Sequence, residues 1–169
     1  MNKKINVIKL IIAIAIPLAV GMLSSFITKD AMISYNAMKK PPLAPPGILF
    51  PIVWTILYIL MGVSSYIIYT YDAKYDTSIL NIKNKSLSLY VIQLVFNFLW
   101  SIIFFKFRLY ILAFVWLIIL WILVFKLMRE SSKISKVSSY LLIPYLVWMT
   151  FAAYLNIWVA ILNLYLNLH

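Results

Sequence analysis

Five long apolar stretches, separated by short charged segments, dominate the pattern of the chain. A helix that crosses a bilayer needs roughly 20 apolar residues, because the hydrocarbon core is about 30 Å thick. The stretches do not alternate apolar with polar residues, which argues against a membrane β-barrel. The pattern therefore predicts an all-α membrane protein, with residues 1–169 folded as a single bundle of five transmembrane helices. We expect these helices at about residues 7–27, 50–71, 87–105, 109–127 and 140–165.

The composition strengthens this prediction and excludes several classes of protein. Apolar residues make up 65% of the 169 residues and charged residues 11%, which is too few polar groups for a water-soluble domain. The chain has no cysteine, and its only histidine is the last residue, so thiolate chemistry and a buried imidazole base are excluded. The four acids are expected in the connections, so we predict no metal site, proton-coupled pump or intramembrane hydrolase. They are Asp30, Asp72, Asp76 and Glu130.

Basic residues are distributed unevenly between the two sides of the predicted bundle. Ten of the fifteen lie on the side of the N-terminus: Lys3, Lys4, Lys9, Lys74, Lys83, Lys85, Lys126, Arg129, Lys133 and Lys136. The other side carries the remaining five: Lys29, Lys39, Lys40, Lys106 and Arg108. The positive-inside rule then places the N-terminus in the cytoplasm and the C-terminus outside. The net charge of +11 is thereby explained as topology, and we expect no nucleic-acid partner.

The segment 28–49 between the first two predicted helices is the longest connection and is rich in proline. Four prolines stand within six positions, at residues 41, 42, 45 and 46. Proline fixes φ and favours extended backbone, so this connection is stiff. It acts either as a lid over the mouth of the bundle or as a rigid spacer, and these residues alone favour neither.

Polar and aromatic residues recur at helical spacing on three of the predicted helices. The three stripes consist of Trp54 and Tyr58, of Gln93, Asn97 and Trp100, and of Tyr145, Trp148, Ala152 and Asn156. Such residues either bond one another between helices or line a cavity for a flat, mostly apolar ligand. The other tryptophans, Trp116, Trp121 and Trp158, are expected to face lipid or the membrane interface.

Five segments of the chain carry a recognisable combination of motifs. They are residues 39–47 (KKPPLAPPG), 50–62 (FPIVWTILYILMG), 93–100 (QLVFNFLW), 144–148 (PYLVW) and 152–156 (AAYLN). Together they resemble the translocator protein family, also called TspO, tryptophan-rich sensory protein or peripheral-type benzodiazepine receptor. The resemblance covers roughly residues 5–165. It implies a five-helix bundle with a ligand cavity under the loop between helices 1 and 2, in an integral protein of the bacterial cytoplasmic membrane.

The stripes and the resemblance together indicate which residues bind the ligand. The expected ligand is a protoporphyrin-like tetrapyrrole or an isoquinoline-type drug, and no cofactor is expected. Lys39 or Lys40 would meet the carboxylates of a porphyrin. No internal histidine or cysteine is present to ligate haem iron, so metal-free porphyrin is expected to bind better than haem. The indicated residues are Tyr35, Pro41, Pro42, Ala44, Trp54, Tyr58, Asn97, Trp100, Tyr145, Trp148 and Ala152.

The resemblance implies a membrane receptor or carrier that acts in tetrapyrrole handling or stress sensing. The alternative is an enzyme that degrades porphyrin in light, for which the family's implicated tryptophans correspond to Trp54 and Trp148. Ser34 stands where many members have a tryptophan, so one pocket-covering tryptophan is missing. The animal cholesterol motif needs a basic residue shortly after a tyrosine in the fifth helix, and no basic residue follows Lys136, so cholesterol recognition is not expected. A homodimer is kept as an option, although residues 87–105 lack the pair of small residues through which some members dimerise.

Overall fold

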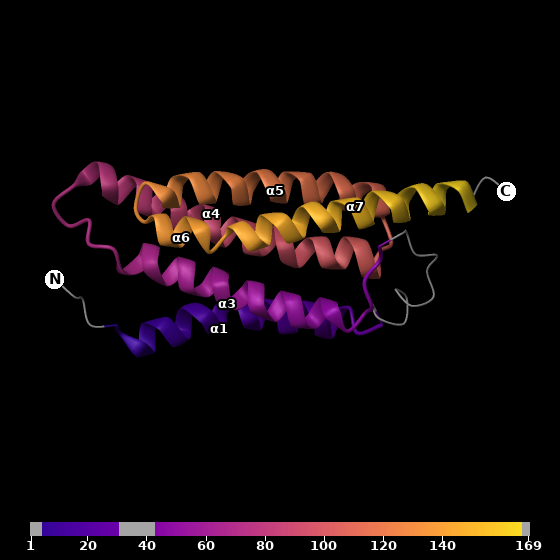
Figure 1. Cartoon of the computed structure of the whole chain (residues 1–169), viewed down its shortest axis with the longest axis horizontal. Helices are drawn as coiled ribbons and strands as arrows, with labels where there is room; N and C mark the ends of the chain where they lie inside the picture. The colour runs from indigo at the N-terminus through magenta and orange to yellow at the C-terminus, as the bar shows by residue number, and fades with distance from the viewer. Residues whose placement is uncertain (1–4, 31–42, 167–169) are drawn as a thin grey trace.

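Long helices running roughly along one axis make up the computed structural model, which describes residues 5–30 and 43–166 and side chains up to residue 162 (Figure 1). Five helical segments are long and apolar enough to cross a membrane, and no strand occurs in the described ranges. The prediction of an all-α bundle of five spans is confirmed. The elements are α1 (Val7–Ile27), α3 (Leu49–Thr70), α4 (Thr77–Ser101), the π-helix η1 (Ile102–Lys106), α5 (Tyr110–Ser132), α6 (Lys136–Tyr140) and α7 (Ile143–Leu166).

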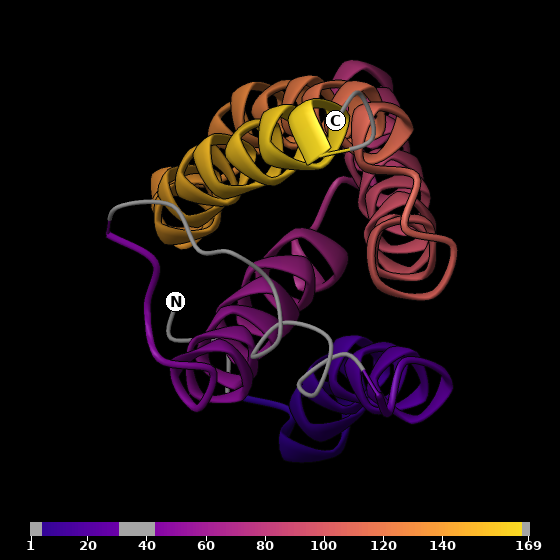
Figure 2. The ribbon, with the colours of Figure 1, turned by 90° about the vertical axis from the view of Figure 1, so that its right-hand side faces the viewer.

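The helices lie side by side, as the view along the bundle shows (Figure 2). The most extensive contacts are between α1 and α3, between α4 and α5, and between α5 and α7. The N-terminal end of α1, the α3–α4 connection and the α5–α6 connection lie at one end of the bundle, and the C-terminus lies at the other (Figure 1). The three basic connections therefore share one end, as the topology argument requires. Their location in the cytoplasm stays a prediction.

The third span begins ten residues earlier than the hydrophobic pattern indicated, at Thr77 rather than at residue 87. Asp76 caps this helix, because its side-chain oxygen accepts a hydrogen bond from the backbone N–H of Ile79 at 3.0 Å. The added turns contain Lys83 and Lys85, whose charges ended the apolar run. The span begins earlier than predicted because the Asp76 cap stabilises a polar first turn that hydropathy does not detect. At its other end the span continues into η1.

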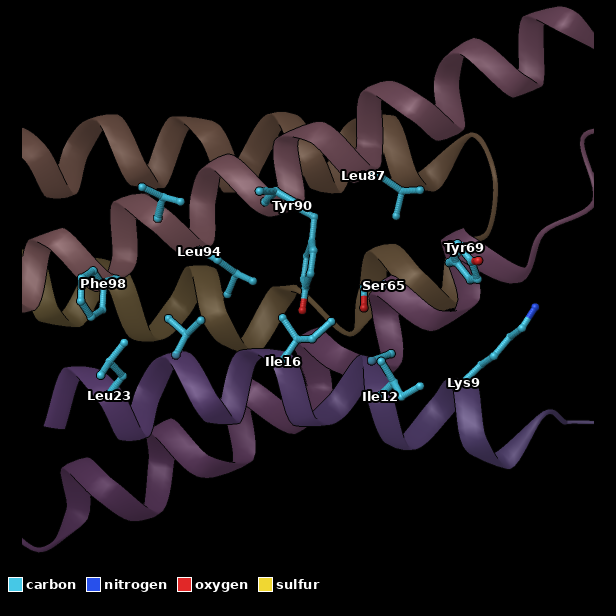
Figure 3. A pocket seen from close by; sticks show the side chains of 14 residues that line it. Lys9, Ile12, Ile16, Leu23, Ser65, Tyr69, Leu87, Tyr90, Leu94 and Phe98 are labelled. Carbon is cyan, nitrogen blue, oxygen red and sulfur yellow. The ribbon is translucent and has the colours of Figure 1, made fainter. Parts of the chain in front are cut away.

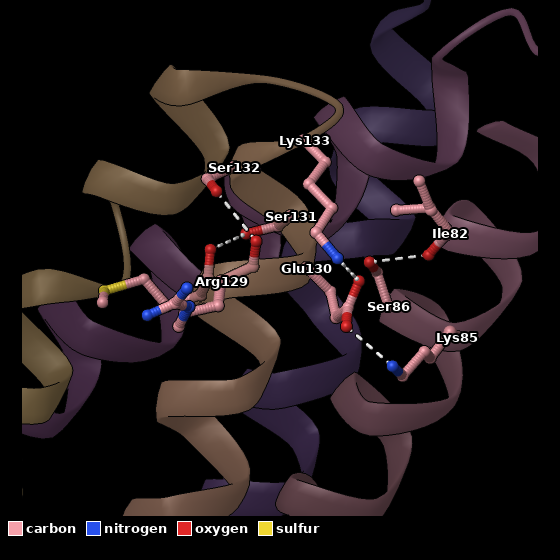
Figure 4. Close-up of polar contacts among 9 residues, drawn as sticks. Ile82, Lys85, Ser86, Arg129, Glu130, Ser131, Ser132 and Lys133 are labelled. Atoms are coloured by element: carbon pink, nitrogen blue, oxygen red, sulfur yellow. Dashed lines mark hydrogen bonds and ion pairs between the residues drawn. The ribbon is translucent and has the colours of Figure 1, made fainter. Parts of the chain in front are cut away.

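The fourth and fifth spans also differ from the expected boundaries. Glu130 lies in the last turns of α5 rather than in a connection. Its carboxylate accepts hydrogen bonds from the ammonium groups of Lys85 and Lys133, each at 2.7 Å, which ties α5 to α4 (Figure 4). The last span is broken into α6 and α7, with a turn at residues 141 and 142 before Pro144 in the first turn of α7. Proline is favoured in a first turn because its missing N–H has no partner there anyway.

Close packing of α1 on α3 depends on glycine. A Cβ atom added at Gly62 would lie 2.6 Å from the Cα of Ile14 and 2.8 Å from the carbonyl oxygen of Ala13. A Cβ atom added at Gly21 would overlap the ring of Tyr58. Small residues allow helix backbones to approach closely in lipid, where no hydrophobic effect drives helices together. These two glycines thus allow α1 to lie directly against α3, including the ring of Tyr58.

Candidate functional site

A buried hydrogen-bonded group joins three helices at the centre of the bundle. The side-chain oxygen of Asn97 on α4 accepts a hydrogen bond from the hydroxyl of Tyr58 on α3 at 2.9 Å. The amide nitrogen of Asn97 donates to the hydroxyl of Tyr145 on α7, also at 2.9 Å. The exposed fractions are 7% for Tyr58, 1% for Asn97 and 0% for Tyr145. Since polar groups in a membrane need partners within the protein, these hydrogen bonds hold α3, α4 and α7 together.

Trp100 belongs to a second polar group farther along α4. Its indole N–H donates to the side-chain oxygen of Asn156 at 3.4 Å, and the amide nitrogen of Asn156 donates to the carbonyl of Tyr110 at 2.8 Å. The Trp100 ring also stacks on Phe104, with centroids 5.5 Å apart. Trp100 is buried and committed to these contacts. It therefore helps to hold α4, α5 and α7 together, and its role in ligand binding stays a prediction.

Aromatic rings gather at the start of α3, next to the proline-rich connection. Trp54 packs on Tyr58 and on Tyr145, with centroid separations of 5.4 and 5.9 Å. Phe50 meets Trp148 edge to face at 5.9 Å. We call Phe50, Trp54, Tyr145 and Trp148 the aromatic cluster. Trp54 and Trp148 are half-buried, so part of each ring is exposed.

Within the aromatic cluster, one polar atom is left unsatisfied. The indole nitrogen of Trp148 is buried and has no hydrogen-bond partner among the described residues. An unpaired buried donor costs about 1–3 kcal/mol, so it is uncommon without a reason. The cluster therefore presents two half-buried tryptophan rings and one N–H group that can still donate.

The structure brings together five of the predicted ligand-binding residues, namely Trp54, Tyr58, Asn97, Tyr145 and Trp148. Ala152 is buried one turn beyond Trp148, and Ala44 is half-buried in the connection before α3. Three further predicted residues, Tyr35, Pro41 and Pro42, lie outside the described residues, as do Lys39 and Lys40.

Two of the tryptophans expected to face lipid or the membrane interface donate hydrogen bonds to neighbouring helices. The indole N–H of Trp116 donates to the carbonyl of Phe96 at 2.9 Å, and the two rings stack with centroids 4.5 Å apart. The indole N–H of Trp121 donates to the hydroxyl of Thr150 at 3.1 Å. Both rings are half-buried and Trp158 is exposed, and the orientation of all three toward lipid or the interface stays a prediction. The partners of these indoles lie on other helices, which spacing along one helix does not reveal.

An open groove that the sequence did not indicate runs between α1, α3 and α4 (Figure 3). Its volume is about 730 Å³. None of its lining residues belongs to the aromatic cluster, so the two features are separate. We call it the α1–α4 groove, and its walls include Lys9, Ile16, Tyr90, Leu94 and Phe98. Periodicity could not predict it, because its walls come from helices whose adjacency is fixed only by the fold.

These features define an integral membrane protein with a helical-bundle fold and an uncharged, aromatic interior. Among the described residues, the buried polar side chains are those of serine, glutamine and asparagine. The model of the TspO/MBR family matches residues 13–162, which is most of the chain. The chain belongs to the TspO/MBR family, as the motifs indicated.

Relatives from bacteria, archaea and animals match over long stretches. The tryptophan-rich protein TspO of Chlorobaculum tepidum is 38% identical over 165 residues, covering 96% of this chain and 99% of the relative. The protein of the same name from Archaeoglobus fulgidus is 35% identical over 159 residues, covering 94% and 99%. The translocator protein of Ovis aries is 33% identical over 122 residues, covering 72% and 70%.

Proposed function

We propose that the protein is a membrane receptor or carrier that binds porphyrin-like tetrapyrroles and isoquinoline-type drugs at the aromatic cluster. The site lies beneath the connection between α1 and α3, and the role is in tetrapyrrole handling or stress sensing. The observation that carries the proposal is the buried indole N–H of Trp148, which has no partner among the described residues. A ligand with an acceptor atom at this point recovers the cost of the unpaired donor.

The chemistry of the cluster suits a flat, mostly apolar ligand with acceptors on its edge. A porphyrin is such a plate, with carboxylates on one side. The half-buried rings of Trp54 and Trp148 offer aromatic faces and edges for stacking. Tyr58, which packs against Trp54, is held in place by its hydrogen bond to Asn97. The contact of Lys39 or Lys40 with the carboxylates rests on the sequence alone.

The residues of the site favour a metal-free ring over haem. No group of histidine, cysteine, aspartate or glutamate suited to a metal ion occurs in the part of the chain that the structure describes. The aromatic cluster supplies indole, phenyl and phenol groups. Indole and phenyl do not ligate iron, and the one phenol of the cluster, that of Tyr145, is buried and already accepts a hydrogen bond from Asn97. Stacking therefore contributes most of the affinity, and a central iron adds nothing to it.

A fluorescence titration tests the proposed site. Metal-free protoporphyrin is added to the purified protein in detergent micelles, and quenching of tryptophan fluorescence is followed. Trp54→Ala and Trp148→Ala are expected to weaken binding, whereas Trp158→Ala, a matched change at an exposed tryptophan, is expected to leave it unchanged. Wild-type affinity in both cluster variants would show that the ligand binds elsewhere.

A second candidate function is light-dependent breakdown of the bound porphyrin. It is favoured by the position of Trp54, whose ring contacts two tyrosines, because indole and phenol side chains are readily oxidised. The complex is illuminated, and the porphyrin absorbance is compared with that of free porphyrin in the same micelles. Loss beyond ordinary bleaching that disappears in Trp54→Phe or Trp148→Phe supports the enzyme. Equal loss with and without protein leaves the receptor or carrier as the function.

A further inference from the structure

The α1–α4 groove has the length and surface of a site for a lipid chain. It follows α1 from Lys9 to Leu23, which is about 21 Å at a rise of about 1.5 Å per residue. One leaflet contributes about 15 Å of hydrocarbon, half of the bilayer core of about 30 Å. The walls are almost wholly apolar, and Ile16 and Val95 are each 50% exposed. An acyl chain of the surrounding membrane can therefore enter from the side and lie along the helices.

The mouth of the groove carries an excess of positive charge. A second cavity of about 520 Å³ adjoins it, and Lys9 and Tyr69 line both. The ammonium groups of Lys9 and Lys83 lie 5.4 and 5.6 Å from the centre of the Tyr69 ring. Lys83 donates one hydrogen bond to the carbonyl of Tyr71 at 2.9 Å, and an ammonium has three donors. Asp72 also lines the mouth, so the described residues that line the two cavities include two lysines and one carboxylate, a net charge of +1.

A polar group without a partner lies inside the groove. The hydroxyl of Tyr90 is buried and has no hydrogen-bond partner among the described residues. It points across the groove toward α1, beside Ser65, whose own hydroxyl donates to the carbonyl of Gly62 at 2.9 Å (Figure 3). A purely hydrocarbon occupant leaves the Tyr90 hydroxyl with no neighbour to bond other than the hydroxyl of Ser65. The carbonyl oxygen of a glycerol ester would accept a hydrogen bond from the Tyr90 hydroxyl.

We propose that the α1–α4 groove binds one anionic phospholipid, with its phosphate between Lys9 and Lys83 and an acyl chain along α1 and α4. The groove separates the α1–α3 pair from α4, and this lipid fills the space between them. The mouth lies at the more basic end of the bundle, where juxtamembrane lysines attract anionic lipids. This site goes beyond the proposed function, because it shares no residue with the aromatic cluster.

Native mass spectrometry of the full-length protein tests the headgroup preference. The protein is released from nanodiscs containing equal amounts of phosphatidylglycerol and phosphatidylcholine, and the retained lipids are identified. We expect one retained phosphatidylglycerol, with affinity falling about five-fold for each charge removed in Lys9→Gln and Lys83→Gln. The control is a Lys126→Gln/Lys136→Gln double variant, which removes basic residues that line neither cavity. Equal retention of both lipids, or equal loss in the control, would overturn the proposal.

A fluorescence measurement tests the place of binding. Because the chain has no cysteine, Val95→Cys in the groove and Val115→Cys on α5 can each carry a single dye. Both valines are 50% exposed, so bulk lipid reaches them equally. Phosphatidylglycerol with brominated chains should quench the dye at residue 95 at a lower mole fraction than the dye at residue 115. Identical quenching curves would indicate ordinary boundary lipid, and displacement by protoporphyrin would show that the occupant is the tetrapyrrole.

Discussion

Replacing Asn97 by leucine removes both hydrogen bonds of the central group with little change in volume. Tyr58 then loses its acceptor and Tyr145 its donor, each from a 2.9 Å contact. Hydrogen bonds between membrane helices contribute about 0.6 kcal/mol on average and up to about 1.7 kcal/mol. Both tyrosines are buried, so water cannot replace the lost partner. We therefore expect Asn97→Leu to lower the free energy of unfolding by about 1–3 kcal/mol.

The assay is unfolding of the purified protein in mixed micelles by increasing amounts of sodium dodecyl sulfate, followed by circular dichroism. Asn84→Leu is the matched control, because it makes the same change at an exposed position of the same helix. Such a surface change is expected to stay within about 0.5 kcal/mol of the wild type.

A triple variant separates hydrogen bonding from packing. Tyr58→Phe and Tyr145→Phe added to Asn97→Leu remove the two orphaned hydroxyls. Replacing all partners of a buried hydrogen bond by apolar groups is nearly neutral, whereas removing one partner is costly. The triple variant should recover most of the lost stability. A neutral Asn97→Leu, or a triple variant less stable than the single one, would refute this account of the core.

Three further predictions follow from the same structure. Gly62→Ala should lower the free energy of unfolding by about 1–3 kcal/mol, seen as a lower thermal midpoint, because the added methyl meets the backbone of α1. The same measurement on Ser25→Ala, a change at an exposed position of α1, should show no such loss. Asp76→Ala should cost about 0.5–2 kcal/mol in denaturant unfolding through loss of the α4 cap, and Asp76→Ser should restore most of it. Metal-free protoporphyrin should bind more tightly than haem in parallel titrations, and equal affinities would count against stacking as the main contribution.

Much of the fold followed from hydrophobic length alone. Five apolar runs predicted five spans, because a bilayer core sets the number of apolar residues that a helix needs. The boundaries at Thr77 and Glu130 were missed for a physical reason. Helices extend into the interface wherever a cap or an ion pair stabilises polar turns, and a cap such as Asp76 contributes nothing to hydropathy.

The candidate site could be predicted in part. Helical spacing placed Trp54 with Tyr58, Asn97 with Trp100, and Tyr145 with Trp148 on common helix faces, and the family motifs then marked these faces as the ligand site. Spacing within one helix could not show that Asn97 bridges the two tyrosines, nor that Trp100 bonds Asn156 instead. Such pairings depend on which helices are neighbours. The α1–α4 groove was missed for the same reason.

The central claim is that a tetrapyrrole accepts a hydrogen bond from the indole N–H of Trp148. The six tryptophans of the chain give six indole N–H signals in a nitrogen-edited NMR spectrum of the ¹⁵N-labelled protein. On addition of metal-free protoporphyrin, we predict that the Trp148 signal moves most, while that of Trp116, already bonded to the carbonyl of Phe96, stays in place. Saturable binding that leaves the Trp148 signal unmoved would contradict the account.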